Sequence, residues 1–354
     1  MYKRQGFISS IEHILPYQGL SESKFFLCKH NGVEFLTKLS FYKKTTPEIY
    51  STGSGDFIAV NPHDAEIGIL RILKKKIIDG NISPCILELI FHKKCSDIET
   101  AVPIQENCDK IILNTSKTTI SDTVYGMFCK HNDLVKSGLA HKKFSFLILE
   151  ECDITFHGFI IRYIESNPLD YAIFKSLMFQ IIYTLYAISV IYPDFRHADL
   201  HTENVMLKFD PNYKFQYDKP QFMLFTVDGV PMYVPYFGIV CKIIDFGFAS
   251  IPEENIRSFV AEDRQLMYMR SDNDMLFFLY DIYTVAGTHK SVEKFLKAIE
   301  PLETWKHHNT EYIRRHEKEI ASYKDMVECK VFDEYKRDPD TIPPAYIFHE
   351  YTPV

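Results

Sequence analysis

The periodicity of apolar residues changes near residue 150 of this 354-residue chain. Before that point, β-prone runs flank Asn31-Gly32, a pair that favours a tight hairpin because both turn residues must accept positive φ. After it, residues 174–188 carry apolar side chains at close to helical spacing, which predicts a buried core helix. We therefore expect an α+β fold of two lobes, a β-rich lobe over 1–150 with one main helix and a mostly helical lobe over 151–354.

The composition excludes several classes of protein. With 46% apolar and 25% charged residues, the chain is a globular protein rather than a disordered or fibrous one. Its formal net charge of −7 argues against a broad nucleic-acid-binding face. The eight cysteines include no C-x-x-C pair, so we expect reduced thiols. We find neither a signal peptide nor a run of about 18 apolar residues, and expect no membrane span and an intracellular protein, in the cytoplasm or nucleus.

Two charged residues of the first lobe are placed where they could meet. Lys38 lies in a β-prone run, and Pro62 begins a predicted helix over 62–78. Glu66 precedes apolar residues of this helix by 4, 7 and 11 positions, so it lies on the buried stripe. A buried carboxylate without a partner is costly, and Glu66 therefore needs a cation nearby.

Two segments depart from the two-lobe pattern of strands and helices. Residues 93–143 are polar and without clear period, and we interpret them as an insertion of loops. Residues 208–240 are β-prone around Asp228-Gly229, which predicts a second hairpin inside an insertion of the second lobe. The proline-spaced tail has no assignable role; its prolines are Pro339, Pro343, Pro344 and Pro353.

The strongest chemical signal is a pair of motifs in the second lobe. Asp199-Leu-His201 is followed by Asn204, and a β-prone stretch then leads to Asp245-Phe-Gly. Phosphoryl transfer needs one carboxylate to orient the attacking hydroxyl, and an amide oxygen and a second carboxylate to hold Mg²⁺ on the phosphates. Asp199, Asn204 and Asp245 fit these roles in that order, and their order and spacing are the signature of protein kinases.

Over roughly residues 15–290 the chain resembles the protein kinase superfamily, and within it the haspin-like kinases and the serine/threonine kinases of large DNA viruses. Three stretches carry the resemblance: 175–180 leading to Asp199, 199–205, and 235–238 leading to Asp245. The resemblance implies one two-lobed kinase domain, ATP with Mg²⁺, and phosphorylation of Ser or Thr in a basic protein segment. A composition rich in Ile, Lys, Phe and Tyr is also compatible with an AT-rich viral genome.

The resemblance gives the upstream residues a role. Lys38 and Glu66 match the Lys–Glu pair that holds the α- and β-phosphates. Gly19 and Ser21 occupy the place of the glycine-rich loop, of which only the first glycine is kept. Backbone groups of Glu150 and Cys152 are expected to meet the adenine. The expected catalytic residues are Asp199, Lys38 and Glu66, the expected ATP-binding set is Lys38, Gly19, Ser21, Glu150, Cys152, Asn204 and Asp245, and the expected metal ligands are Asn204 and Asp245.

The chain also departs from the kinase pattern. Ala198 replaces the usual Arg, which makes control by phosphorylation of the activation segment less expected. His201 replaces the usual Lys, a feature of haspin-like and of small-molecule kinases, so a small-molecule kinase is an alternative. The depleted glycine loop makes a pseudokinase binding module a third reading. His197 and His201 do not fit the H-E-x-x-H zinc motif, and His197 is better interpreted as a packed residue. Asp272 or Asp274 could begin a helix that buttresses the catalytic loop.

Overall fold

The computed structural model separates the chain into two compact units. The first comprises Met1–Ile67 with Glu88–Glu151, and the second Gly68–Leu87 with Cys152–Val354. The segment Gly68–Leu87, which we expected in the first lobe, therefore belongs to the second unit. The described residues are 11–14, 24–30, 33–44, 49–52, 55–58, 61–96, 120–163, 168–214, 216, 219–257, 273–301, 303–306 and 320–352.

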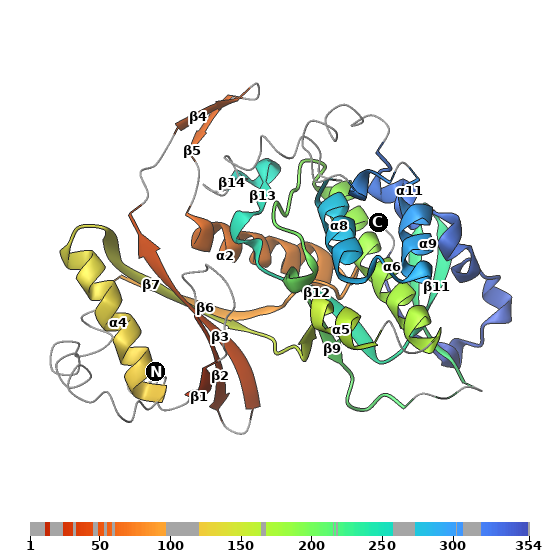
Figure 1. The fold of residues 1–354 in the computed structure, drawn as a ribbon, viewed down its shortest axis with the longest axis horizontal. Helices are drawn as coiled ribbons and strands as arrows, with labels where there is room; N and C mark the ends of the chain where they lie inside the picture. Colours follow the sequence, from red (N-terminus) through yellow and green to blue (C-terminus); the bar gives the residue numbers. More distant parts are fainter. Residues whose placement is uncertain are drawn as a thin grey trace. The chain divides into compact units, whose positions relative to one another are not determined.

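A five-stranded antiparallel sheet forms the frame of the first unit (Figure 1). Its order is β1 (Ile11–Ile14), β2 (Lys24–His30), β3 (Val33–Lys43), β7 (Ala140–Leu149) and β6 (Leu89–Cys95). His30 lies opposite Val33, so the predicted hairpin is confirmed, although Asn31 and Gly32 lie outside the described residues. A separate hairpin joins β4 (Ile49–Thr52) to β5 (Gly55–Ile58).

Successive side chains of β3 point to opposite faces of this sheet, and each face meets a different helix. Lys38 and Tyr42 bond to the first turns of α2 (Pro62–Leu73), which continues as a π-helical turn over Lys74–Ile78. The predicted helix over 62–78 is thus confirmed. Phe41 instead packs edge-on against Phe128 of α4 (Ile120–Lys136), which runs beside β7.

Two expectations for the first unit are wrong. Residues 93–143 are not only loops, because α4 and the ends of β6 and β7 lie within them. The helix was missed because its apolar stripe passes through His131, a polar residue that is buried here and stacks on Phe41. The cysteines are not all reduced, since Cys129 of α4 is disulfide-bonded. Five other described cysteines form no disulfide: Cys85, Cys95, Cys152, Cys241 and Cys329.

The core helix of the second unit is α6 (Pro168–Ile191). Within it, Tyr171–Ile191 is long and apolar enough to cross a membrane, with a mean hydropathy of 1.5, but 78% of that window is buried inside the protein. Burial of this kind is typical of a core helix, as the periodicity predicts. No other helix among the described residues passes the same test. The other α-helices within the described part of the unit are α5 (Phe156–Tyr163), α8 (Asn273–Ala286), α9 (Lys290–Ile299) and α11 (Tyr323–Val327).

Small sheets complete the second unit. One has the order β12 (Ile239–Ile243), β9 (Val205–Phe209) and β8 (Ile154–Thr155), and a short hairpin pairs β13 (Ser250–Ile251) with β14 (Ile256–Arg257). The other has the order β11 (Val230–Tyr236), β10 (Gln221–Val227) and β15 (Ile347–Glu350). Short 3₁₀ turns cover Thr202–Asn204, Phe246–Phe248, Pro252–Glu254, Thr304–Lys306, Lys330–Tyr335, Pro339–Thr341 and Pro344–Tyr346.

The insertion hairpin is confirmed, and the tail joins it. Asp228 and Gly229 have φ of 47° and 79°, the left-handed conformation that a two-residue hairpin turn requires at both positions. Strand β15 comes from the proline-spaced tail and pairs in parallel with β10. The tail to which the sequence assigned no role is therefore part of a sheet.

Candidate active site

Lys38 and Glu66 form a buried ion pair in the first unit. The Lys38 Nζ lies 2.7 Å from Oε1 and 2.8 Å from Oε2 of Glu66, and the side chains are each only 4% exposed. The ring of Phe25 on β2 lies 5.4 Å from the same nitrogen. The carboxylate that the sequence placed on a buried stripe therefore has its cation, 28 residues away in the chain.

A second bond ties the same helix to the same strand. The hydroxyl of Tyr42 donates to Asp64 Oδ1 at 2.7 Å. Tyr42 lies four residues after Lys38 on β3, and Asp64 lies two residues before Glu66 on α2. Because alternate residues of a strand share a face, Lys38 and Tyr42 present both contacts to α2. The position of Glu66 is thus fixed at two neighbouring points.

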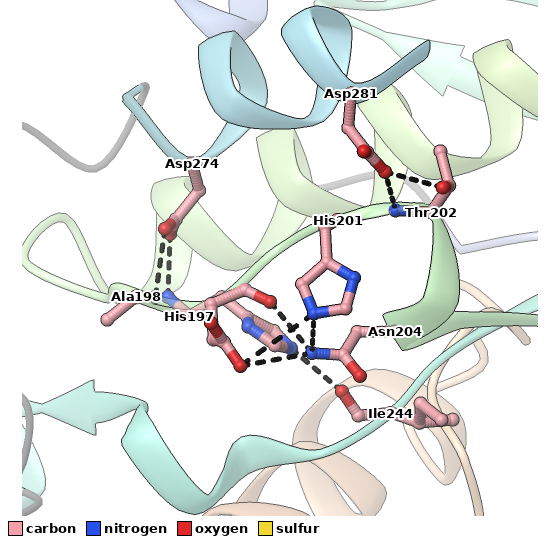
Figure 2. Close-up of polar contacts among 9 residues, drawn as sticks. His197, Ala198, His201, Thr202, Asn204, Ile244, Asp274 and Asp281 are labelled. Carbon is pink, nitrogen blue, oxygen red and sulfur yellow. Dashed lines mark hydrogen bonds and ion pairs between the residues drawn. The ribbon is translucent and has the colours of Figure 1, made fainter. Parts of the chain in front are cut away.

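In the second unit, the loop that carries Asp199 is held by a buried carboxylate outside it (Figure 2). The backbone N–H groups of His197 and Ala198 donate to Asp274 Oδ2 and Oδ1 at 2.6 and 2.8 Å. Asp274, near the start of α8, is 1% exposed, and burial raises its pKa to about 7. Ala198 has a φ of 62°, a left-handed conformation that is strained for a residue with a Cβ and persists only where neighbours enforce it.

A second residue of α8 holds the other end of the loop. Thr202 donates to Asp281 Oδ2 through its N–H at 2.7 Å and through its hydroxyl. Asp274 and Asp281 are seven positions apart, so two helical turns place both carboxylates on one face of α8. One helix face therefore anchors the loop that carries Asp199 at two points.

The side-chain amide of Asn204 is directed at Asp199. Its Nδ2 donates to the Asp199 carbonyl at 2.8 Å and to Asp199 Oδ2 at 3.3 Å, and it lies 3.0 Å from Nε2 of His201. The nitrogen faces these acceptors, so the amide Oδ1 is the atom available to a metal ion. The His201 Nε2 in turn lies 3.9 Å from Asp199 Oδ2.

Asp245 follows β12 next to Asn204, since the N–H of Ile244 donates to the Asn204 carbonyl at 3.0 Å. Asp245 is left-handed, with φ 61° and ψ 64°, and leads into a turn whose Phe246 is fully buried against His197. The His197 ring donates from Nε2 to the Ile244 carbonyl at 2.9 Å, and burial lowers its pKa. The interpretation of His197 as a packed residue supporting the loop is confirmed.

The donor atoms offered here fit Mg²⁺. An amide oxygen and a carboxylate are hard ligands, and Mg²⁺ in phosphoryl-transfer sites takes only one or two protein carboxylates together with substrate phosphates. Among the described residues, no group of three or more His, Cys, Asp or Glu side chains could hold a metal ion. Oδ1 of Asn204 and the carboxylate of Asp245 are therefore the groups that could hold a magnesium ion.

Of the residues expected to contact the adenine and the phosphates, the structure describes only some. The N–H of Glu150 donates to the Glu88 carbonyl at 3.1 Å, and its Oε1 accepts from the Glu88 N–H at 2.8 Å. Cys152, partly exposed, belongs to the second unit. Gly19 and Ser21 lie outside the described residues.

Sequence reasoning found part of the loop's support. Asp272 or Asp274 was expected to begin a helix behind the loop. Helix α8 begins at Asn273, Asp274 lies in its first turn and accepts from the His197 N–H, and Asp272 lies outside the described residues. Asp281 was missed. It is one acid within an apolar helix, and only its seven-residue spacing from Asp274 could have pointed to a second anchor.

Comparisons with known proteins agree with these motifs. No family model matches the chain. Two proteins of Acanthamoeba polyphaga mimivirus, both provisionally named serine/threonine-protein kinases, are similar to it. One is 28% identical over 193 residues, which is 54% of this chain and 38% of that protein. The other is 23% identical over 241 residues, 63% of this chain and 60% of that protein. The chain thus matches less than two thirds of either relative.

Solved structures with some likeness include the kinase domain of PF14_0431, with 15% identity and a TM-score of 0.33, covering 68% of this chain and 51% of that one. WaaP in complex with acyl carrier protein has 10% identity and a TM-score of 0.38, covering 89% and 87%. The resemblance to viral protein kinases is confirmed by the two mimivirus proteins. The α+β fold of kinase type is confirmed by the sheet with its Lys–Glu pair and the mostly helical second unit.

Proposed function

We propose that this protein is an ATP- and Mg²⁺-dependent serine/threonine protein kinase, which transfers the γ-phosphoryl group of ATP to a hydroxyl of a protein substrate. One observation carries the proposal: the Asn204 amide holds Asp199 on a loop that Asp274 fixes from behind. The names of the two viral relatives support a kinase in general terms. Serine/threonine specificity, the cofactors and an intracellular location, in a host cell or virion, are parts of the proposal.

Each residue has a role in this proposal. Asp199 orients the substrate hydroxyl and accepts its proton, while Lys38, positioned by Glu66, binds the phosphates. Oδ1 of Asn204 and the carboxylate of Asp245 would hold Mg²⁺, which neutralises charge on the phosphates when bound. Catalysis is then mainly positioning and charge compensation. The adenine and the phosphates would also be bound by backbone groups of Glu150, Cys152, Gly19 and Ser21.

The proposed substrate is a basic protein segment, as the resemblance implies. The structure gives two of the exposed acids near the catalytic loop other partners: Glu253 accepts from the Asp194 N–H and Glu254 from the Tyr192 hydroxyl, each at 2.9 Å. These carboxylates therefore support their own loop. Recognition of a basic substrate would have to use other acids, such as Glu203, which is about half exposed.

The test is transfer of label from γ-labelled ATP with Mg²⁺ to a mixture of basic proteins. We expect Asp199→Asn to lower transfer by about 10²- to 10⁴-fold, the usual contribution of a general base, while ATP binding remains. Asp194→Asn is the matched control, because it makes the same change at an exposed position five residues earlier and should retain activity. Equal transfer by Asp199→Asn and the control would refute the assignment.

A small-molecule kinase is the second candidate. It is favoured by His201, whose Nε2 lies 3.0 Å from the Asn204 amide in the position usually held by Lys. The same assay separates the two, since consumption of ATP by a small hydroxyl acceptor without labelled protein would support it. Nucleotide binding without any consumption would support a pseudokinase instead.

A further inference from the structure

The first unit contains a cavity lined by charged side chains that have no role in the proposed kinase site. The cavity has a volume of about 350 Å³ and lies between the end of β3, the first turn of α2 and the adjoining parts of β6 and β7. Lys94, His141 and Lys143 line it, with Asp64 as its one carboxylate. Neither Lys38 nor Glu66 lines it. The cavity is therefore a separate site within the same unit.

The side chains of Lys94, His141 and Lys143 enter the cavity from two neighbouring strands. His141 and Lys143 are alternate residues of β7, and Lys94 of β6 lies opposite Ser145, the next residue in the same alternation. Tyr42 of β3 lies on this face as well, because its neighbour Phe41 pairs with Phe144 and points the other way. These side chains thus line the cavity beside the first turn of α2.

The cavity has more side chains that can donate to an anion than it has carboxylates. Asp64 accepts from Lys94 Nζ at 2.6 Å and from the Tyr42 hydroxyl at 2.7 Å, so its charge is already matched. Within the described residues, no carboxylate lies within ion-pair distance of Lys143 or His141. Two side chains that can donate to an anion therefore remain, and Lys94, with a side chain half exposed, can turn to the same ligand.

We propose that this cavity binds a phosphoryl group. A phosphoryl group carries negative charge and three acceptor oxygens, which match the donors Lys143, His141 and Lys94 in number, whereas a single carboxylate would match fewer. The volume admits a phosphorylated side chain but is at the lower end for a nucleotide-sized ligand. The source is either a phosphorylated protein segment or a free phosphorylated small molecule.

The position of the cavity links it to the candidate active site. Asp64 lies two residues before Glu66 on α2, and Tyr42 four residues after Lys38 on β3. A ligand that draws Lys94 away from Asp64 changes the contacts of the helix turn next to Glu66. Binding at this cavity therefore acts on the same two elements that hold the Lys38–Glu66 pair.

The test measures binding to the full chain by calorimetry, with ADP present to fill the proposed nucleotide site. The probes are inorganic phosphate, a short neutral peptide containing phosphoserine, and the same peptide unphosphorylated. We expect Lys143→Met to weaken binding of phosphate by about tenfold or more, through loss of a charge-assisted hydrogen bond. Lys93→Met is the matched control, since it removes the same charge from the opposite face of β6 and should bind like the unmodified protein.

The outcomes separate the two sources. Tighter binding of the phosphopeptide than of inorganic phosphate, with no binding of the unphosphorylated peptide, supports a phosphorylated protein segment. Equal affinities support a small phosphorylated molecule. Binding by Lys143→Met that equals binding by the control, or no binding of either phosphorylated probe at millimolar concentration, would overturn the proposal. Because Lys143 is not in the proposed kinase site, absence of kinase activity would not affect this result.

Discussion

The two units hold their candidate site residues by different means. In the first unit, Lys38 and Glu66 hold each other, through one ion pair between two buried side chains. In the second, Asp199 is held indirectly: backbone N–H groups of His197 and Ala198 donate to Asp274, a residue that need not touch any substrate. The first arrangement depends on two side chains of the site itself. The second depends on carboxylates of a helix behind it.

This difference changes what a substitution should do. Removing one charge of a buried pair leaves the other in a medium of low dielectric, so stability and function fall together. Removing a distant anchor acts on the shape of a loop whose chemical groups are all still present. Stability measurements on the two units therefore test the comparison more directly than activity alone.

The largest effect on stability is expected at the buried Lys38–Glu66 ion pair. Lys38→Met removes the cation 2.7 Å from the Glu66 carboxylate and should lower the free energy of unfolding by about 3–5 kcal/mol, as for other buried ion pairs that lose one partner. The measurement is urea denaturation at neutral pH. Lys38→Met combined with Glu66→Leu should regain most of the stability but no kinase activity. A double variant as unstable as the single one would show that the pair is not the source of the loss.

A pH titration of stability sharpens the comparison for the second unit. Burial raises the pKa of Asp274 from its ordinary 3.8 to about 7, against the opposing effect of the two N–H donors and of Arg196 and with a smaller contribution from Asp199. Between these pH values the folded protein keeps a proton that the unfolded chain has released. The free energy of unfolding should therefore fall as pH rises from about 4 to 7, by up to about 4 kcal/mol.

The control for this titration is Asp274→Asn, which cannot titrate. Thermal unfolding of both proteins across pH 4–8 gives the difference due to Asp274 alone, since other titrating groups are shared. We expect the unmodified protein to lose stability relative to the variant as pH rises. Parallel curves would mean that Asp274 is ionised throughout, and that its two backbone donors outweigh its burial.

The smallest effect is expected at an exposed ion pair whose N–O distance equals that of the Lys38–Glu66 pair. Lys336 Nζ lies 2.7 Å from Asp333 Oδ1, the same distance as in the Lys38–Glu66 pair, but these side chains are 37% and 54% exposed. Solvent screens this interaction, so Lys336→Ala should cost less than about 1 kcal/mol in urea denaturation. A loss as large as that of Lys38→Met would show that distance, and not burial, decides the strength of these pairs.

Much of the fold was predictable because its signals are local. The turn at Asp228-Gly229 needs two residues tolerant of positive φ, and both are present in the sequence. The helix from Pro62 has an entry proline and an apolar stripe, and that stripe identified Glu66 as buried before its partner was known. The motif residues around Asp199 were noticed for a different reason, since their order and spacing match the signature of protein kinases.

What could not be predicted depends on contacts between distant parts of the chain. Helix α4 was missed because a buried His131 interrupts its apolar count. A hydrogen bond from its Nε2 to the His141 carbonyl at 2.8 Å and its stacking on Phe41 explain why a histidine is tolerated there. The role of Asp281 depends on Thr202, 79 residues away. The contribution of the tail to a sheet depends on pairing of β15 with β10, in which Ile347 lies opposite Phe222, a residue distant in the chain.

The tail strand has a consequence for the order in which the protein is made. Asn81 donates to the Glu350 carbonyl across 269 residues, and its own carbonyl accepts from the Thr352 N–H. Tyr351 also contacts β10, where it donates its N–H to the Leu224 carbonyl and stacks on Phe225. On the ribosome, the edge of β10 and the polar groups of Asn81 must wait for residues 347–352 to emerge. The second unit therefore reaches its native form only after these residues have been made, and until then the edge of β10 is open.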